Sequence, residues 1–187
     1  MLSNISRGAV SPIDARLMAG ERVLWRGQPD RRAYTFRGPW YLIPFSIMWA
    51  GFAFVWEGVA LTSGAPPLFA VWGVPFCAVG VYFVAGRFWV AAREAERTTY
   101  AITDRRVMIQ SGAFAPRYIE LSLGSLPSPQ LEERADGTGT ISFGGAYPFQ
   151  TWGAAGWPGT GRSPAFVAIR EAGRVFRVLE EARSGAA

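Results

Sequence analysis

The sequence predicts an α+β protein, in which a two-helix transmembrane hairpin is joined to a small β-rich domain closed by a C-terminal helix. Three observations predict this class. Residues 38–86 carry a single charged residue, Glu57, and contain two long apolar runs. Short runs of β-branched and alternating residues begin near residue 98. The last segment, 170–183, has apolar residues at helical spacing.

The two apolar runs, 40–59 and 68–90, predict the hairpin. Each run has roughly the 20 residues that a helix needs to cross about 30 Å of hydrocarbon. In lipid the backbone has to satisfy its own hydrogen bonds, so a run of this kind is expected to be helical. A polar, Gly- and Pro-bearing segment, 61–67, separates the runs. Four rings suited to the headgroup level lie near their ends: Trp40, Tyr41, Trp56 and Trp89.

The arginines predict the orientation of the hairpin. Arginines precede the first run and follow the second, and the connecting loop has none. Because positive residues stay on the cytoplasmic side, we expect two passes with both termini cytoplasmic. The chain then divides into an N-terminal cytoplasmic segment (1–37, a short helix and a strand), the hairpin (38–90) and a cytoplasmic domain (91–187).

Glu57 allows two interpretations. An ionisable residue deep in lipid is a functional hypothesis by default. Glu57 follows Trp56 near the far end of its run, which favours a carboxylate at the membrane–water interface. A further alternative for the runs themselves is a pair of buried helices in a soluble core, which a chain of 187 residues could not easily enclose.

Composition limits the chemistry that the chain can perform. The chain has no His, and its single Cys77 lies in the second apolar run. We therefore expect no catalytic residue, no metal site and no cofactor. The net charge of +5 comes largely from arginines beside the spans, so it does not predict nucleic-acid binding. Gly156–Ser163 approaches a phosphate-binding loop but has Arg162 where that loop needs Lys.

The β-rich part of the chain predicts a series of short strands. Before the hairpin, Val23 and Trp25 alternate with polar residues and predict one strand. Asp136-Gly137 predicts a hairpin turn. Gly144–Pro164 is a long Gly- and aromatic-rich loop. The other expected strands are 98–103, 107–111, 117–121, 129–134, 140–143 and 165–169.

Three motifs resemble one family. They are Gly20-Glu-Arg-Val-Leu-Trp-Arg-Gly-Gln-Pro29, Tyr100-Ala-Ile-Thr-Asp-Arg-Arg-Val107 and Gly137-Thr-Gly-Thr-Ile141. Together they resemble the bacterial pleckstrin-homology-like (PH-like) membrane proteins. The resemblance implies a PH-like β-barrel or strongly bent sheet of about seven strands, capped by the final helix. It also implies that the hairpin is inserted after the first strand, in which case Val23 and Trp25 join the barrel. Members of this family generally have no settled biochemical activity.

Two groups of residues are candidate sites. Arg93, Arg97, Arg105 and Arg106 are candidates for contact with lipid headgroups, by analogy with the basic mouth of eukaryotic PH domains. The alternative is that Arg105 caps the turn or forms a salt bridge within it. Trp152 and Trp157 are candidates for a partner-docking loop, and the alternative is that they pack over one end of the barrel.

These features predict a PH-like binding or scaffold module in the bacterial inner membrane. The module is expected to bind either a partner protein or the anionic surface of membrane lipid. The hairpin anchors it and is a candidate for homo-oligomerisation. The second hypothesis is an accessory subunit of a larger inner-membrane complex. The third, an enzyme that uses the 144–164 loop, has the least support because His and a usable Cys are absent. No nucleic-acid partner is expected.

Overall fold

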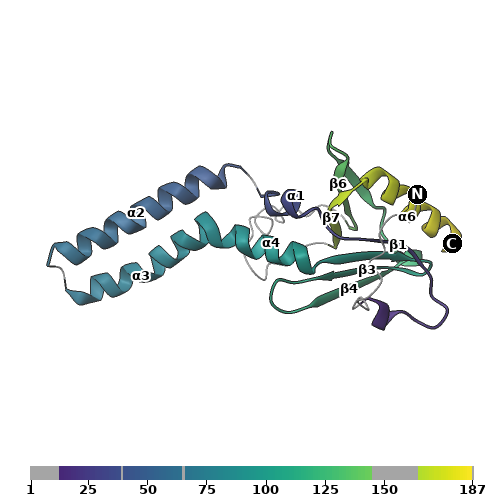
Figure 1. Ribbon diagram of the computed structural model, residues 1–187, viewed down its shortest axis with the longest axis horizontal. Coiled ribbons are helices and arrows are strands. Elements are labelled where there is room, and N and C mark those ends of the chain that lie inside the picture. Colours follow the sequence, from purple (N-terminus) through teal and green to yellow (C-terminus); the bar gives the residue numbers. More distant parts are fainter. Residues whose placement is uncertain (1–12, 39, 65, 145–163, 187) are drawn as a thin grey trace.

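The computed structural model describes residues 13–38, 40–64, 66–144 and 164–186. Two long helices lie side by side and project from a β-rich domain (Figure 1). The connection between α2 and α3 lies at the end of the molecule farthest from that domain. The fold is therefore α+β, with the helical hairpin and the strands in separate regions.

The helical hairpin matches the two apolar runs. Helix α2 covers Leu42–Thr62. Its partner begins with α3 (Pro67–Val81), passes through a π-helical segment (Tyr82–Gly86) and ends with α4 (Arg87–Arg97). The second helix is therefore continuous over 31 residues. Within the described residues, these two helices are long enough and apolar enough to cross a membrane.

Small residues bring the two helices close together. A Cβ built on Gly80 would lie 3.0 Å from the Cα atom of Ala50. Ala50, Ala53, Gly73 and Gly80 are buried between the helices, whereas most of the large apolar side chains are exposed. Small residues at a helix contact let backbones approach, which is the usual packing of helices in lipid.

Two antiparallel sheets form the β-rich domain. The first has the order β1-β2-β3-β4 and the second has the order β5-β6-β7. In the first sheet the strands are Val23–Gly27, Thr99–Thr103, Arg106–Ser111 and Arg117–Ser122. In the second they are Gln130–Glu133, Thr138–Ser142 and Ala165–Arg170. Because β1 pairs with β2, the hairpin is inserted after the first strand, as the resemblance implied.

The expected barrel is not closed. A short 3-10 helix, Leu123–Ser125, separates β4 from β5, and no described ladder joins the two sheets. Between β2 of the first sheet and β7 of the second, the buried hydroxyl of Tyr100 forms hydrogen bonds with the backbone of Val167. It accepts the N–H at 3.1 Å and donates to the carbonyl oxygen at 3.4 Å. A side chain therefore takes the hydrogen bonds that a neighbouring strand would need to close the barrel.

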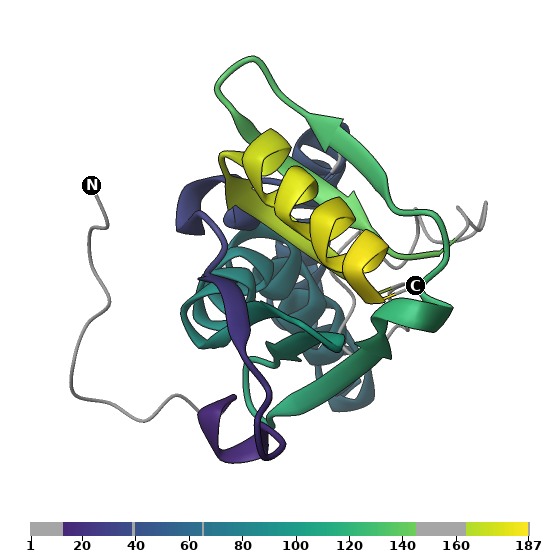
Figure 2. The same ribbon diagram turned by 90° about the vertical axis from the view of Figure 1, so that its right-hand side faces the viewer.

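The core lies between the two sheets and the C-terminal helix α6 (Ala172–Ala186), which packs across them (Figure 2). Ala172, Val175 and Leu179 on one face of α6 are buried, as the sequence predicted. The rings of Tyr100 and Phe166 lie 4.8 Å apart at the centre of the core. The core residues are Tyr100, Ile102, Val107, Ile109, Leu123, Leu126, Ile141, Phe143, Phe166, Ile169, Ala172, Val175, Leu179 and Ala182.

Candidate functional site

A short helix that the sequence did not predict, α1 (Arg31–Thr35), packs against α4 and forms a neck between the hairpin and the domain. Tyr34 of α1 is buried against Ala95 of α4. Arg31 pairs with Glu96 at 2.8 Å, and the Phe36 and Phe88 rings lie 5.4 Å apart. The neck fixes where the helical hairpin enters the domain.

Asp30 fastens the neck to the second sheet. Its carboxylate caps α1 by accepting the N–H groups of Arg32 and Ala33, each at 3.0 Å. It also accepts a hydrogen bond from Arg170 of β7 at 2.7 Å. These contacts hold the pKa of Asp30 below its usual value. The hydrogen bond from the Ala33 N–H has the largest effect, and that from Arg170 the next largest. The Asp30 N–H donates to the carbonyl oxygen of Ala168 at 2.6 Å.

A bulge in β7 makes these contacts possible. The β6–β7 register shifts between Gly139 and Ile141. In the bulge, Ala168 has φ of +54°, a left-handed conformation that is costly for a residue with a Cβ atom. The bulge turns Val167 toward the Tyr100 hydroxyl and Ala168 toward Asp30. The hydrogen bonds made at this strained bulge connect β7 to Tyr100 in the core and to Asp30 in the neck.

The β3–β4 loop, Gly112–Pro116, lies beside α4 at the end of the sheet nearest the hairpin (Figure 1). Arg93 Nε and Arg97 Nη1 of α4 both donate to the carbonyl oxygen of Ala113, at 3.2 Å and 3.0 Å. The ring of Phe114 lies 6.1 Å from that of Trp89. Arginines and aromatic rings therefore share one surface where the hairpin meets the domain.

The four candidate arginines do not form one cluster. Arg93 and Arg97 lie together at the β3–β4 loop, whereas Arg105 and Arg106 lie at the opposite end of the β2–β3 hairpin. Arg105 is exposed. The Arg106 guanidinium is largely buried and is bound by the carboxylates of Glu21 and Glu120. The ion pairs at this turn are therefore formed by Arg106 and not by Arg105, the residue for which the sequence suggested them.

Glu21 is the buried partner of Arg106. Arg106 donates to both Glu21 oxygens, at 2.9 Å and 2.7 Å, and the Thr103 hydroxyl donates to Oε1 at 2.8 Å. The Met18 N–H donates to Oε2 at 2.8 Å. The hydrogen bonds from Arg106 outweigh the opposing effect of burial and lower the pKa of Glu21 to about 2.

A polar recess of about 390 Å³ lies between the neck and the end of the first sheet. The side-chain oxygen Oε1 of Gln110 is buried without a hydrogen-bond partner among the described residues. A buried acceptor of this kind is uncommon, because leaving it unpaired costs free energy. The recess is lined by Gln28, Glu96, Arg97, Thr99, Gln110, Ser111, Gly112 and Pro116.

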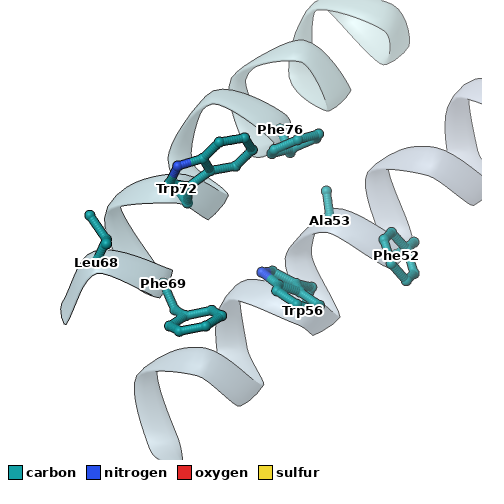
Figure 3. Close-up of a pocket in the computed structure, with 7 residues that line it drawn as sticks. All are labelled: Phe52, Ala53, Trp56, Leu68, Phe69, Trp72 and Phe76. Atoms are coloured by element: carbon teal, nitrogen blue, oxygen red, sulfur yellow. The ribbon is translucent and has the colours of Figure 1, made fainter. Parts of the chain in front are cut away.

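An apolar recess of about 500 Å³ opens between α2 and α3 in the half of the hairpin near their connection (Figure 3). It is lined by Phe52, Ala53, Trp56, Leu68, Phe69, Trp72 and Phe76. Glu57 lies next to it. Its Oε2 atom is buried against Gly73, where a Cβ would come within 1.7 Å. One oxygen of the Glu57 carboxylate is thus enclosed by the second helix, and its position at the membrane–water interface stays a prediction.

Several candidate residues lie outside the described part of the chain, and others were missed. Trp152 and Trp157 fall within 145–163, which the structure does not describe. Among the described residues, no group of acidic or Cys side chains could hold a metal ion. Sequence reasoning missed the pairing of Trp89 with Phe114. The only signal for it was a large apolar residue in a turn between Gly112 and Pro116.

The fold and these sites define a class of protein: a PH-like domain of two sheets and a capping helix, with two apolar helices inserted after its first strand. The family model of the bacterial PH domain matches residues 42–183. The chain therefore belongs to the bacterial PH domain family. The match begins at the first residue of α2, so it includes both apolar helices. No curated protein and no solved structure matches the chain.

Proposed function

We propose that this protein is a membrane-anchored binding module without enzymatic activity. In this proposal α2 and the α3–α4 helix cross the bacterial inner membrane, both termini are cytoplasmic, and the PH-like domain lies at the cytoplasmic face. The observation that carries the proposal is the continuous helix Pro67–Arg97, whose apolar part leads through the neck directly into β2. A helix that continues from the apolar run into the domain would hold the domain close to the bilayer.

The proposed division of the chain follows from this arrangement. Residues 1–37 form an N-terminal cytoplasmic segment that gives β1 to the domain, 38–90 form the transmembrane hairpin, and 91–187 form the rest of the PH-like domain. The connection at 63–66 has no charge, and arginines flank the opposite ends of both helices. This distribution supports the cytoplasmic position of the domain.

An anionic lipid surface is the ligand that the geometry supports best. Arg93 and Arg97 lie on the α4 face beside the β3–β4 loop, within the first turns after the apolar helix. Each arginine donates one of the five N–H groups of its guanidinium to the carbonyl oxygen of Ala113. Further N–H groups would suit phosphate oxygens, and a cation near an anionic membrane contributes about 1 kcal/mol. The four candidate arginines then divide into two proposed headgroup contacts, Arg93 and Arg97, and two residues at the far turn, Arg105 and Arg106.

Affinity purification of the full-length protein in a mild detergent, followed by mass spectrometry of bound lipids and proteins, tests the proposal. We expect anionic phospholipid to be enriched with the wild type. The double variant Arg93→Gln/Arg97→Gln should lose that enrichment. The matched control Arg22→Gln/Arg105→Gln removes the same charge at the far turn and should retain it. Equal lipid binding by all three proteins would contradict the assignment.

The same experiment distinguishes the second candidate function. The apolar recess between α2 and α3 exposes aromatic rings that a neighbouring membrane helix could cover. A protein bound in fixed stoichiometry would favour an accessory subunit of a larger inner-membrane complex, and would direct attention to Trp152 and Trp157. Additional copies of this chain would indicate a homo-oligomer. An enzymatic activity that disappears with Arg162→Gln or Ser163→Ala, in a folded protein, would contradict the binding-module proposal.

A further inference from the structure

Phe114 is exposed at the tip of a tightly built loop. Its side chain is 66% exposed, although the β3–β4 loop has only five residues between two strands. Gly112 has φ of +128°, and a Cβ there would lie 2.0 Å from the Ala115 carbonyl oxygen, so the turn requires glycine. Single exposed apolar residues are common on protein surfaces. The location of Phe114, rather than its exposure, is therefore the informative observation.

Phe114 lies at the level where the apolar helix would leave the membrane. Its ring is 6.1 Å from that of Trp89, which is itself 60% exposed. At about 1.5 Å per residue, roughly 33 Å of helix separates Pro67 from Trp89. That length is close to the thickness of the hydrocarbon core, about 30 Å. Trp89 and Phe114 would both reach the boundary between acyl chains and headgroups, where aromatic rings are favoured.

Hydrogen bonds from α4 hold the β3–β4 loop in this position. Ala113 is buried, and its carbonyl oxygen accepts from both Arg93 and Arg97. The Arg93 guanidinium also lies 5.8 Å from the centre of the Trp89 ring. The loop is thus tied to α4 on the side away from the hairpin, while the Phe114 ring remains uncovered. The two arginines would lie at the height of the phosphates when the rings lie in the acyl boundary.

We infer that Phe114 and Trp89 form an interfacial anchor, which inserts the β3–β4 loop into the cytoplasmic leaflet of the bilayer that holds the hairpin. This inference rests on the proposed membrane anchoring. The two rings would contact phospholipids at the boundary between their acyl chains and headgroups. The loop gives the domain a third attachment to the bilayer beside the two helices, which would add to the neck in setting the tilt of the domain.

Spin labels in proteoliposomes of phosphatidylethanolamine and phosphatidylglycerol test the anchor. In a Cys77→Ala background, one cysteine is placed at a time: Phe114→Cys at the tip, Val55→Cys on the exposed face of α2, and Ser184→Cys in α6. Helix α6 lies at the end of the domain away from the hairpin (Figure 1). Accessibility to oxygen and to a water-soluble nickel chelate reports the depth of each label. Ala115→Cys provides a second label in the loop that retains Phe114.

The inference predicts that labels at 55, 114 and 115 contact lipid, with 114 and 115 shallower than 55, and that the label at 184 is in water. If position 55 is in lipid but both loop labels are as accessible to the chelate as position 184, the loop is not inserted in the bilayer. That result would refute the interfacial anchor and would leave the proposed membrane-anchored module unaffected. If position 55 is itself in water, the proposed function fails, and the anchor fails with it.

Discussion

Glu21 and Arg106, which are 85 residues apart in the chain, form a two-point ion pair that joins the segment before β1 to the start of β3. The Glu21 side chain has no exposed surface, and that of Arg106 is 12% exposed. The hairpin is inserted between these two residues. This pair therefore fixes the first strand to the rest of the domain across the insertion.

Glu21→Gln should destabilise the domain strongly. The substitution removes the charge that Arg106 faces and leaves a buried guanidinium with less compensation, which typically costs 3–5 kcal/mol. We expect Tm of the full-length protein in detergent to fall by roughly 10 °C. Glu120→Gln is the matched control, because Glu120 also pairs with Arg106 but is 31% exposed. It should lower Tm by much less, and equal losses would contradict the central role of Glu21.

The Glu21 contribution should depend on pH in one direction. The pKa of Glu21 is about 2 in the folded protein and 4.5 in its ordinary state. A lowered pKa stabilises the folded state above pH 4.5, and this contribution, about 3 kcal/mol, is lost as the pH falls toward 2. The Tm difference between wild type and Glu21→Gln should be constant near neutral pH and should shrink below pH 4.5. A difference that grows on acidification would refute the assignment.

The crossing of α2 and α3 should be detectable with a disulfide. The Cβ of Ala50 would lie 3.2 Å from a Cβ at Gly80, close to the 3.5–4.5 Å of natural disulfides. In a Cys77→Ala background, Ala50→Cys/Gly80→Cys should oxidise readily, so that maleimide–polyethylene glycol no longer adds to the chain. Gly51→Cys/Gly80→Cys is the control, because Gly51 meets nothing within 4 Å. Equal cross-linking of the two pairs would show that the helices pack differently.

The strained bulge at Ala168 should tolerate glycine and reject a β-branched residue. Glycine removes the left-handed strain but loses a buried methyl group, so Ala168→Gly should change the free energy of unfolding by less than about 1 kcal/mol. Ala168→Val should cost roughly 2 kcal/mol or more, because valine is strained at φ of +54° and is larger. Ala165→Val, in the same strand, should be nearly neutral. Thermal unfolding of the three variants measures this, and a harmless Ala168→Val would mean that the bulge is not strained.

The sequence was sufficient for the features that depend on local periodicity. The alternation at Val23 and Trp25 predicted β1, and the apolar spacing at Val175 and Leu179 predicted the capping helix. The apolar runs predicted both helices of the hairpin to within a few residues at most of their ends. The strand and the capping helix show one apolar face and the hairpin helices are long apolar runs, and a sequence displays both features directly.

Features that depend on distant contacts were not visible. Helix α1 has only five residues, so its stability comes from Tyr34 packing on Ala95 rather than from its own propensity. The Tyr100 hydroxyl binds the backbone of Val167 in the second sheet, and no local pattern predicts this contact. Arg105 and Arg106 are adjacent, yet Arg105 is exposed, whereas the Arg106 side chain is only 12% exposed and pairs with Glu21.

The central claim, that α2 and the α3–α4 helix anchor the domain to the cytoplasmic face of the membrane, is tested most directly by labelling cysteines in intact cells. In a Cys77→Ala background, Ser63→Cys lies in the connection between the helices and Ser184→Cys lies in α6. A membrane-impermeant maleimide should label position 63 in intact cells and position 184 only after lysis. Labelling of position 184 but not 63 in intact cells, or release of the protein from membranes by alkaline carbonate, would contradict the account.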